Sequence, residues 1–429
     1  MTEGTSVSVD PTLLDDLQWR GLLAHSTDLD VLREALTSSS VRFYVGFDPT
    51  APSLHLGNLV QILTAKRLQD AGHTPFALVG GATGMIGDPR DSGERTLNDA
   101  DTVAEWVGRV RAQIEPFLSF EGENAATMVN NLDWTAGLST IDFLRDIGKH
   151  FPVNRMLARD TVKRRLEAGG ISYTEFSYVL LQSMDFLALY RQHGVTLQFG
   201  GSDQWGNITG GAELIRRAEG GTAHAFATPL ITKSDGTKYG KTEGGALWLD
   251  PSMMSPYAFF QFWLNVEDAS VSEMLRIFTF LSRAEIEEIE ATHAEKPFLR
   301  AGQKALAEHV TTLVHGAVET ARIQAASAAL FGGGDMADLA GDTLGAALGE
   351  AGAITVSAGE MPSIVDLFVE TGLAASKGEA RRAVKEGGAY LNNERVRDAD
   401  FVPGPDDLVG GHWLVLRKGK KSFRGVEVS

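Results

Sequence analysis

Short apolar segments alternate with longer helical patterns through the first half of the chain, and this alternation is the strongest constraint on its fold. Residues 41–47 predict a strand whose odd-numbered side chains share one apolar face. Residues 75–79 predict a buried strand that leads into the glycine-rich run 80–84. The pattern also predicts a helix from residue 56, a helix over 174–190, a strand over 196–199 and a helix over 206–218. Strands joined through helices predict an α/β domain with a doubly wound parallel sheet.

The second half of the chain changes character twice. From about residue 255 to 330, strand signals fade and helical patterns dominate. The following stretch is rich in Gly and Ala, and no Lys or Arg occurs between Ile323 and Ser376, which predicts a partly helical linker. The end of the chain predicts a small α+β module with helices over 364–371 and 377–386. We therefore predict four parts, which span residues 1–235, 236–330, 331–360 and 361–429.

Composition excludes several classes of protein. The 429 residues include no cysteine, which excludes disulfides and thiolate metal sites. The N-terminal segment is polar and acidic, unlike a signal peptide, and the most apolar stretch, 257–266, is too short to cross a bilayer. We therefore interpret the protein as cytoplasmic, without a membrane partner.

Charge is distributed unevenly along the chain. The formal net charge of −17 argues against a general nucleic-acid binder, because an acidic surface repels phosphate. Residues 361–429 hold 11 Lys/Arg and 10 Asp/Glu, whereas the first 360 residues hold 28 Lys/Arg and 46 Asp/Glu. Any RNA contact must therefore use local basic patches.

Two motifs point to phosphate chemistry. The first, Asp48–Asn58, lies between a predicted strand and a helix start, where backbone N–H groups favour phosphate and a His can donate to its oxygens. It could equally be a strand–helix turn with a capping Ser and an incidental His. The second, Lys238–Thr242, carries two lysines on a glycine-containing loop that can close over a polyphosphate. By itself, this motif could be an exposed basic loop.

A polar stripe marks the helix predicted over 174–190. Tyr178, Gln182 and Asp185 share one face through their i, i+4, i+7 spacing, and the rest of the helix is largely apolar. A solvated stripe is the alternative. A Tyr-Gln-Asp set nevertheless suits the binding of an amino acid better than contact with bulk water.

Together, the two motifs resemble the two signatures of class I aminoacyl-tRNA synthetases, in the expected order and with an α/β domain between them. The chain is similar to bacterial-type tyrosyl-tRNA synthetases from about Leu17 to its C-terminus. The matching segments are 44–50, 80–84, 86–89, 174–178 and 200–207. The resemblance implies a Rossmann-like catalytic domain, an α-helical domain and a small RNA-binding domain shared with a ribosomal protein.

The resemblance also implies roles for individual residues. The substrate ammonium would be held by Tyr178, Gln182 and Asp88, and the phenol hydroxyl by Asp185 and Tyr44. Gln198 would support this pocket, and Asn131 would lie behind the phenol site. ATP and the adenylate would be bound by Gly46, Asp48, Thr50, His55, Gly57, Asn58, Gly201, Asp203, Gln204, Lys238 and Lys241. Catalytic contacts to the phosphates would come from Thr50, His55, Lys238, Lys241 and Thr242, and Arg95 matches a loop arginine of the family.

Three positions depart from the family. Asn58 stands where the first signature usually ends in His, and its amide can still donate, so activity is expected to be retained. Val45 stands where some relatives have Cys, which removes a thiol contact to the ribose. The loop 89–94 replaces a lysine-bearing loop and leaves open whether Arg90 or Arg95 reaches the pyrophosphate.

The C-terminal module is expected to bind RNA. A basic helix face would be formed by Lys377, Arg381, Arg382 and Lys385, with further contacts from Lys418, Lys420 and Lys421. A solvated charged face is the alternative. The implied partners are tRNA(Tyr), L-tyrosine and ATP with its Mg²⁺, and the implied assembly is a homodimer.

The family's reaction is the activation of tyrosine by ATP, followed by its transfer to tRNA. A carboxylate nucleophile needs no general base, which agrees with a predicted site that has no nucleophile dyad and no convincing protein metal cage. Two alternatives stay open. One is a tryptophanyl-tRNA synthetase, which shares the fold, and the other is a non-catalytic RNA-binding or splicing factor derived from a synthetase.

Overall fold

The computed structural model describes residues 8–89, 97–232, 239, 241–242, 245–330, 336, 341–419 and 422–429, without the side chains of 241, 242 and 245. The chain forms two compact units: Met1–Met253 with Ala269–Glu287, and Met254–Asp268 with Glu288–Ser429. The first unit thus extends beyond the predicted boundary at residue 235 and includes a segment of the predicted helical domain. None of the helices in the described ranges combines the length and apolarity that a membrane span needs.

The first unit is built on a six-stranded sheet with the order β1-β6-β5-β2-β3-β4. Neighbouring strands from β6 to β4 run parallel, and the edge strand β1 runs antiparallel to β6. The strands span His25–Ser26 (β1), Arg42–Phe47 (β2), Thr74–Val79 (β3), Thr127–Asn130 (β4), Leu197–Gly201 (β5) and His224–Thr228 (β6). The doubly wound parallel sheet predicted from the sequence is confirmed. Its strand order reverses between β2 and β5, the place where such sheets bind ligands.

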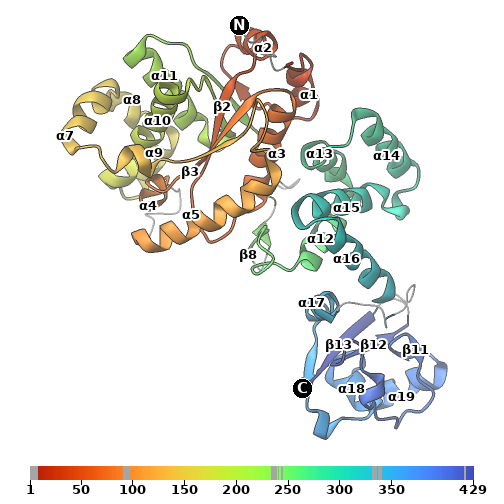
Figure 1. Cartoon of the computed structure of the whole chain (residues 1–429). Coiled ribbons are helices and arrows are strands. Elements are labelled where there is room, and N and C mark those ends of the chain that lie inside the picture. Colours follow the sequence, from red (N-terminus) through yellow and green to blue (C-terminus); the bar gives the residue numbers. More distant parts are fainter. Residues whose placement is uncertain are drawn as a thin grey trace. The chain divides into compact units, whose positions relative to one another are not determined.

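Helices cover both faces of this sheet. Figure 1 shows α10 and α11 on one side and α3 on the other. The helices span Leu13–Trp19 (α1), Leu29–Ser38 (α2), Leu56–Asp70 (α3), Thr83–Ile86 (α4), Ala100–Ile114 (α5), Leu132–Thr135 (α6), Thr140–Asp142 (α7), Val153–Leu157 (α8), Asp160–Ala168 (α9), Tyr173–His193 (α10) and Trp205–Glu219 (α11). Because β2 is covered on both sides, Phe43 and Tyr44 are both buried although they point to opposite faces.

The second unit begins with packed helices and ends in a small sheet. Its helical part contains Pro256–Leu264 (α12), Ala301–His315 (α15) and Ala317–Leu330 (α16), while Arg283–Glu295 (α14) runs from the first unit into the second. The sheet has the order β11-β10-β12-β13-β9. Its strands span Ile354–Val356 (β9), Ala389–Leu391 (β10), Glu394–Arg395 (β11), Trp413–Lys418 (β12) and Ser422–Val428 (β13). Helices α18 (Ile364–Glu370) and α19 (Lys377–Glu386) match the two predicted helices and share one apolar core with the sheet.

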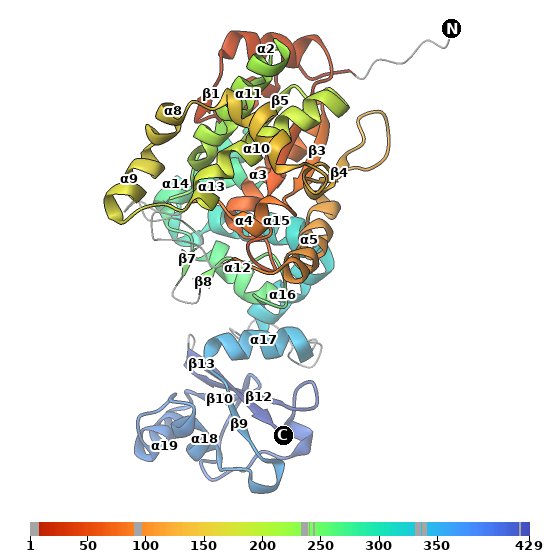
Figure 2. The same ribbon diagram turned by 90° about the vertical axis from the view of Figure 1, so that its left-hand side faces the viewer.

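The stretch over 331–360, predicted as a partly helical linker, contains a described helix and a described strand. Residues Gly341–Ala351 form helix α17 (Figure 2), and β9 pairs in parallel with β13. The small residues that suggested a linker instead allow close packing, because a Cβ on Gly345 would lie 3.0 Å from the ring of Trp413. Leu344 and Leu348 are buried on the same helix. Residues 331–335 and 337–340 lie outside the described ranges.

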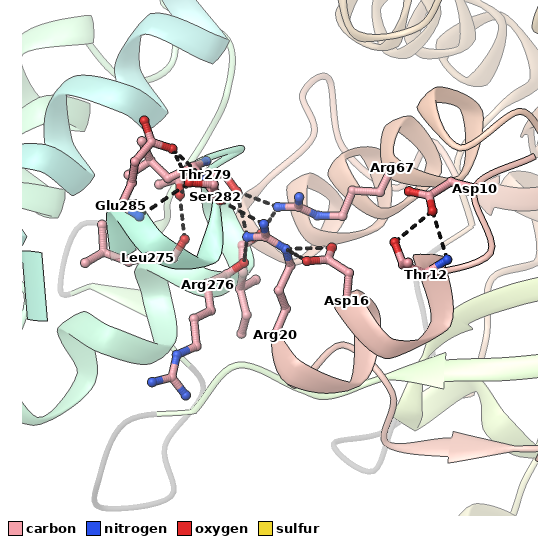
Figure 3. A network of polar contacts seen from close by, with 12 residues as sticks. Asp10, Thr12, Asp16, Arg20, Arg67, Leu275, Arg276, Thr279, Ser282 and Glu285 are labelled. Atoms are coloured by element: carbon pink, nitrogen blue, oxygen red, sulfur yellow. Dashed lines mark hydrogen bonds and ion pairs between the residues drawn. The ribbon is translucent and has the colours of Figure 1, made fainter. Parts of the chain in front are cut away.

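The segment 269–287 is held in the first unit by two buried arginines (Figure 3). Helix α13 spans Asp268–Phe278, and main-chain oxygens near its C-terminus accept from Arg20 and Arg67. Arg20 Nη1 lies 2.9 Å from the oxygen of Arg276, and Arg67 Nη2 lies 2.5 Å from that of Thr279. Burial, together with the neighbouring Arg20, lowers the pKa of Arg67 to about 9, so this side chain stays charged at neutral pH. Positive charge at the negative end of a helix stabilises this attachment.

The β7–β8 pair completes the first unit. Lys241–Thr242 (β7) pairs antiparallel with Gly245–Ala246 (β8), and the following residues return to the start of α3. The N–H of Leu56 donates to the oxygen of Leu247, and His55 forms a bridge with Trp248. The chain after the second signature is therefore attached to the helix that begins within the first one.

Candidate active site

Most of the predicted site residues of the first unit lie around the carboxyl ends of β2, β3, β4 and β5. This edge is where the strand order reverses. Helix α10 contributes its polar stripe to the same place, because Tyr178 and Asp185 contact residues that follow β2 and β4. The residues involved are Tyr44 and Gly46 on β2, Asp48 after it, Asp88 after α4, Asn131 after β4, Gln198 and Gly201 on β5, Asp203 and Gln204 after it, and Tyr178, Gln182 and Asp185 on α10.

Asp185 is the most enclosed acidic group of the site, with 2% of its surface exposed. Asn131 Nδ2 donates to Asp185 Oδ2 over 3.0 Å, and Trp134 Nε1 donates to Oδ1 over 2.9 Å. Burial raises the pKa of Asp185 to about 7, although both donors oppose that change. The carboxyl group is thus held in a fixed orientation by neutral donors rather than by a cation.

Three buried polar atoms in this region have no hydrogen-bond partner among the described residues. They are the hydroxyl of Tyr44, Oε1 of Gln182 and Oε1 of Gln198. Burial, together with the charges of Asp185 and Asp48, raises the pKa of Tyr44 well above its ordinary value, so its hydroxyl remains a donor. Buried polar atoms are normally paired, and three orphans on residues predicted to bind one ligand indicate a polar binding pocket.

Asp48 connects β2, α10 and the glycine-rich run. Its Oδ1 accepts from Thr83 Oγ1 and its Oδ2 from the Tyr178 hydroxyl, both over 2.6 Å. A Cβ on Gly80 would lie 2.0 Å from Asp48 Oδ1, so only glycine fits beside this carboxylate. Asn131 fixes the same run from the other side, because its Oδ1 accepts from the N–H of Ala82 over 2.7 Å.

Asp88 lies beside a second set of side-chain amides. Gln204 Nε2 donates to Asp88 Oδ2 over 2.7 Å, and Asn207 Nδ2 donates to Oδ1 over 3.2 Å. Asn207 in turn accepts from Arg159, which immediately precedes α9. The amides of Gln204 and Asn207 therefore hold a carboxylate that the sequence predicts to bind the substrate ammonium.

The predicted phosphate residues at the start of α3 are more exposed. His55 caps α3: its Nδ1 accepts from the N–H of Gly57 over 3.1 Å, and its own N–H donates to Asn58 Oδ1 over 3.1 Å. Because Nδ1 accepts, the neutral imidazole carries its proton on Nε2, which is assigned here from this hydrogen bond. Thr50 and Gly57 are exposed on the same edge. Asn58 thus serves as a capping side chain in place of the usual His.

Several predicted residues cannot be placed. Arg95 and Lys238 lie outside the described residues, as do Lys420 and Lys421. Lys241 and Thr242 form β7, but their side chains are not described. Within the described ranges, no group of three or more His, Asp and Glu side chains could hold a metal ion.

The predicted RNA-binding residues of α19 differ in their surroundings. Lys377 pairs with Asp366 over 2.5 Å, and Arg381 with Asp400 over 2.8 Å. Lys418 pairs with Glu379 and also donates to the oxygen of Leu373. Arg382 and Lys385 are exposed, and the described residues supply neither of them with an ion pair of this kind. These two side chains therefore carry most of the freely available charge of the helix face.

Comparison with known proteins covers nearly the whole chain. Residues 37–332 match the tRNA synthetases class I (W and Y), and residues 347–426 match the tyrosine–tRNA ligase SYY-like C-terminal domain. The tyrosine–tRNA ligase of Streptomyces coelicolor is 64% identical over 419 residues, which are 97% of this chain and 99% of that protein. That of Thermobifida fusca is 57% identical over 426 residues, 96% of this chain and 99% of that protein. The chain belongs to the tyrosine–tRNA ligase family.

Solved structures of the family agree with this assignment. A C-terminally truncated Aspergillus nidulans mitochondrial tyrosyl-tRNA synthetase is 30% identical, with a TM-score of 0.66, and the match covers 75% of this chain and 93% of that one. The protein is therefore a class I aminoacyl-tRNA synthetase, which is a ligase. Its C-terminal module is the C-terminal domain of tyrosine–tRNA ligases, and the family match to that domain begins at residue 347, inside α17.

Sequence reasoning missed three residues that hydrogen-bond to the side chains of this candidate site. Trp134 supports Asp185, Thr83 supports Asp48, and Arg159 supports Asn207. Their partners are 51, 35 and 48 residues away in the chain, so no local pattern identifies them. Trp134 follows Asn131 by three residues, and the pairing of both with Asp185 depends on the placement of β4 beside β3.

Proposed function

We propose that this tyrosine–tRNA ligase activates L-tyrosine with ATP, forming tyrosyl-adenylate and pyrophosphate, and then transfers tyrosine to the 3′ end of tRNA(Tyr). One observation carries the proposal: a buried carboxylate, Asp185, lies close enough to the buried, unpartnered hydroxyl of Tyr44 for its charge to raise the pKa of that hydroxyl. A phenol hydroxyl is both donor and acceptor, and it satisfies both groups at once.

The part of the site around Tyr44 and Asp185, called the phenol end, is proposed to recognise the substrate side chain. The substrate hydroxyl would donate to Asp185 and accept from Tyr44. Because Asn131 and Trp134 already donate to both oxygens of Asp185, the carboxylate cannot turn to another partner without losing these hydrogen bonds. An indole side chain carries only a donor, so it would leave Tyr44 without an acceptor. This argues against the tryptophanyl alternative.

The substrate ammonium is proposed to lie among Asp88, Tyr178 and Gln182. Asp88 supplies charge, and Gln182 supplies a buried oxygen that has no partner among the described residues. The Tyr178 hydroxyl donates to Asp48, so its oxygen can accept from the substrate ammonium. Gln198, buried on β5 with its own orphan oxygen, is proposed to support the pocket.

ATP is proposed to bind along the edge between α3 and β5. The phosphates would meet Thr50, His55, Lys238, Lys241 and Thr242, with Arg95 or Arg90 near the pyrophosphate. The nucleoside would lie against Gly46, Asp48, Gly57, Asn58, Gly201, Asp203 and Gln204. Gly46 supports this arrangement because it is exposed between the buried residues Val45 and Phe47, which gives a ligand access to the backbone. Magnesium would be carried by the phosphate oxygens of ATP and would neutralise their charge.

The chemistry is proposed to need positioning and charge rather than a base. The tyrosine carboxylate attacks the α-phosphorus in line, and pyrophosphate leaves with the electron pair of the broken bond. Ionised carboxylate is already nucleophilic, so the protein contributes orientation and donors for the developing charge. The terminal ribose hydroxyl of tRNA then attacks the tyrosyl carbonyl, and AMP leaves.

ATP–pyrophosphate exchange across a panel of amino acids tests the proposal. Tyrosine should support exchange, while tryptophan and phenylalanine should not. Exchange with tryptophan alone would support the tryptophanyl alternative. Absence of exchange with every amino acid, despite bound tRNA, would support the non-catalytic RNA-binding alternative.

The C-terminal module is proposed to hold tRNA through Arg382 and Lys385, with Lys377, Arg381 and Lys418 joining when RNA phosphate displaces their ion-pair partners. A chain that stops after residue 340 removes the complete module, including α17. It should retain pyrophosphate exchange and lose most charging of tRNA. The double charge reversal Arg382→Glu with Lys385→Glu keeps the module and should weaken charging, with a smaller effect at high salt. Full charging by the truncated chain would contradict this role.

A homodimer is proposed through the segment that runs from β4 to the start of α10. Three of its apolar side chains are well exposed: Ile141 at 69%, Val153 at 60% and Tyr173 at 67%. Figure 1 shows α7 and α8 of this segment at the edge of the first unit. Exposed apolar surface of this kind favours burial against a second copy. Val153→Glu should shift the mass measured by analytical ultracentrifugation from dimer to monomer, and a wild-type protein that is already monomeric would contradict the proposal.

A further inference from the structure

Four polar side chains form a directed chain of hydrogen bonds that ends on Asp88. Arg159 Nη2 donates to Asn207 Oδ1 over 2.8 Å. Asn207 Nδ2 donates to Gln204 Oε1 over 2.9 Å and to Asp88 Oδ1 over 3.2 Å. Gln204 Nε2 donates to Asp88 Oδ2 over 2.7 Å. Every bond runs from the guanidinium toward the carboxylate.

The direction of this chain is fixed at its first member. An amide presents an oxygen at one end and an NH₂ group at the other, and it can turn over when both ends find partners. A guanidinium has donors only, so the oxygen of Asn207 must face Arg159. That leaves the NH₂ of Asn207 for Gln204 and Asp88, and it obliges Gln204 to present its own NH₂ to the carboxylate. A turned Asn207 would place oxygen against Asp88 and nitrogen against Arg159, which is unfavourable at both ends.

Arg159 is enclosed enough for this role. Burial lowers the pKa of Arg159, and the charge of Asp88 opposes that change, so the two groups interact through space. Gly206 makes room for the guanidinium, because a Cβ there would lie 2.7 Å from Arg159 Nη2. The buried Asn207 lies next to this glycine, at the start of α11.

We propose that Arg159 is a positioning residue for tyrosine: through Asn207 and Gln204 it fixes the orientation in which Asp88 receives the substrate ammonium. The inference rests on the proposed function, since it deepens the assignment of Asp88 to ammonium binding. Arg159 does not touch the substrate. It acts through the two amide donors, because Gln204 Nε2 and Asn207 Nδ2 each fix one oxygen of Asp88 and so set the orientation of the carboxylate.

Two tyrosine analogues separate this role from a general structural one. Tyramine keeps the ammonium and lacks the carboxylate, whereas 3-(4-hydroxyphenyl)propionate keeps the carboxylate and lacks the ammonium. Both are measured as competitive inhibitors of tyrosine-dependent pyrophosphate exchange. Arg159→Met should weaken the binding of tyrosine and of tyramine by about 10-fold, which is the scale of one hydrogen bond to a charged group. The affinity for the propionate should stay within about twofold of the wild-type value. Arg159→Lys, which keeps charge and a donor, should recover part of the loss.

Gly206→Ala tests the contact between Arg159 and Asn207 without replacing either residue. The added methyl group displaces the end of Arg159, a flexible side chain, while alanine is the better helix former at this position in α11. Thermal stability should therefore stay level or rise, while tyrosine and tyramine bind more weakly. Loss of binding with retained stability is an outcome that a packing defect does not give.

Arg155→Met is the matched control. Arg155 lies on α8, is 70% exposed along its side chain, and approaches Glu213 only to 3.9 Å. Arg155→Met should bind tyrosine, tyramine and the propionate with unchanged affinity. If Arg159→Met bound tyramine and the propionate equally weakly, Arg159 would have a structural role. If neither ligand bound more weakly, the chain of hydrogen bonds from Arg159 to Asp88 would have no part in binding. Failure of the wild type to exchange with tyrosine would instead overturn the proposed function, so the two failures are distinct.

Discussion

The two ends of the proposed site are built on opposite principles. At the phenol end, Tyr44, Asn131 and Asp185 are each at most 2% exposed; Asn131 donates to Asp185, and the Tyr44 hydroxyl has no partner among the described residues. At the phosphate end, Thr50, His55 and Gly57 are exposed, and the helix N-terminus faces outward. One end is assembled before any ligand arrives, whereas the other offers donors to a charged group that comes from solvent.

Because of this difference, the enclosed end should govern selectivity between amino acids, and the exposed end should govern the rate of adenylate formation. A buried donor or acceptor that a wrong ligand leaves unpaired costs about 1–3 kcal/mol, which penalises that ligand at the enclosed end. Water can replace a missing partner at the exposed end, so little selectivity arises there. Exposed groups act instead on charge that develops during the reaction, provided that a loop brings cations to it.

The largest expected effect comes from breaking the enclosed end. Asp185→Ala removes the acceptor of Trp134 Nε1, one of the two acceptors of Asn131 Nδ2, and the partner of the substrate hydroxyl. Tyrosine activation should fall by on the order of 10³-fold or more, since three hydrogen bonds in this enclosed region are lost at about 1–3 kcal/mol each. Steady-state pyrophosphate exchange measures this, with Asp70→Ala on the exposed face of α3 as the control. Activation within tenfold of the wild type would contradict the assignment.

The next largest effect is expected at the phosphate end. Lys238→Ala or Lys241→Ala should slow adenylate formation by about 10²–10³-fold, the scale of a lost transition-state donor, with tyrosine affinity nearly unchanged. Single-turnover kinetics gives the rate, and equilibrium dialysis gives the affinity. Lys66→Ala, which removes a lysine paired with Asp70, is the control. A variant that loses tyrosine affinity but keeps its rate would place these lysines at the wrong end of the site.

A smaller effect is expected on selectivity alone. Tyr44→Phe removes the donor to the substrate hydroxyl and leaves Asp185 in place. The ratio of kcat/KM for tyrosine to that for phenylalanine should fall by about tenfold, because one buried hydrogen bond is lost. Phenylalanine itself should be used no worse than before. An unchanged ratio would show that the Tyr44 hydroxyl does not take part in reading the substrate.

The smallest effect is a dependence on pH, and its sign differs between binding and stability. The pKa of Asp185 is raised by burial from 3.8 to about 7. Tyrosine binding should weaken several-fold as pH falls below about 7, because a neutral carboxyl accepts more weakly than a carboxylate. Stability should change in the other direction. The folded state holds a proton that the unfolded state releases between these two pKa values, so the free energy of unfolding should fall as pH rises from about 4 to 7.

Thermal denaturation of Asp185→Asn provides the comparison for this prediction. The variant has no titrating carboxyl at this position, so its stability should lose the part of the pH dependence that Asp185 contributes. Identical pH dependence in both proteins would show that Asp185 does not titrate in this range.

The sequence alone determined the main architecture, because the pattern it uses is local. Period-two and helical spacing gave the parallel sheet, α10 and the two helices of the C-terminal module, and signature segments gave the family. The same reasoning did not show that a small residue within the stretch 341–360, Gly345, packs closely against Trp413. Composition does not reveal whether a glycine is free or packed.

Tertiary structure alone decided which polar groups meet. The pairing of Asp185 with Trp134, of Asp48 with Tyr178 and of Arg159 with Asn207 joins segments that are 48 to 130 residues apart. The direction of an amide, the burial that raises the pKa of Asp185 and the space beside Gly206 all depend on neighbours brought together by the sheet. Local sequence carries backbone preference and the side-chain period, whereas desolvation and hydrogen-bond direction arise only once distant segments are packed.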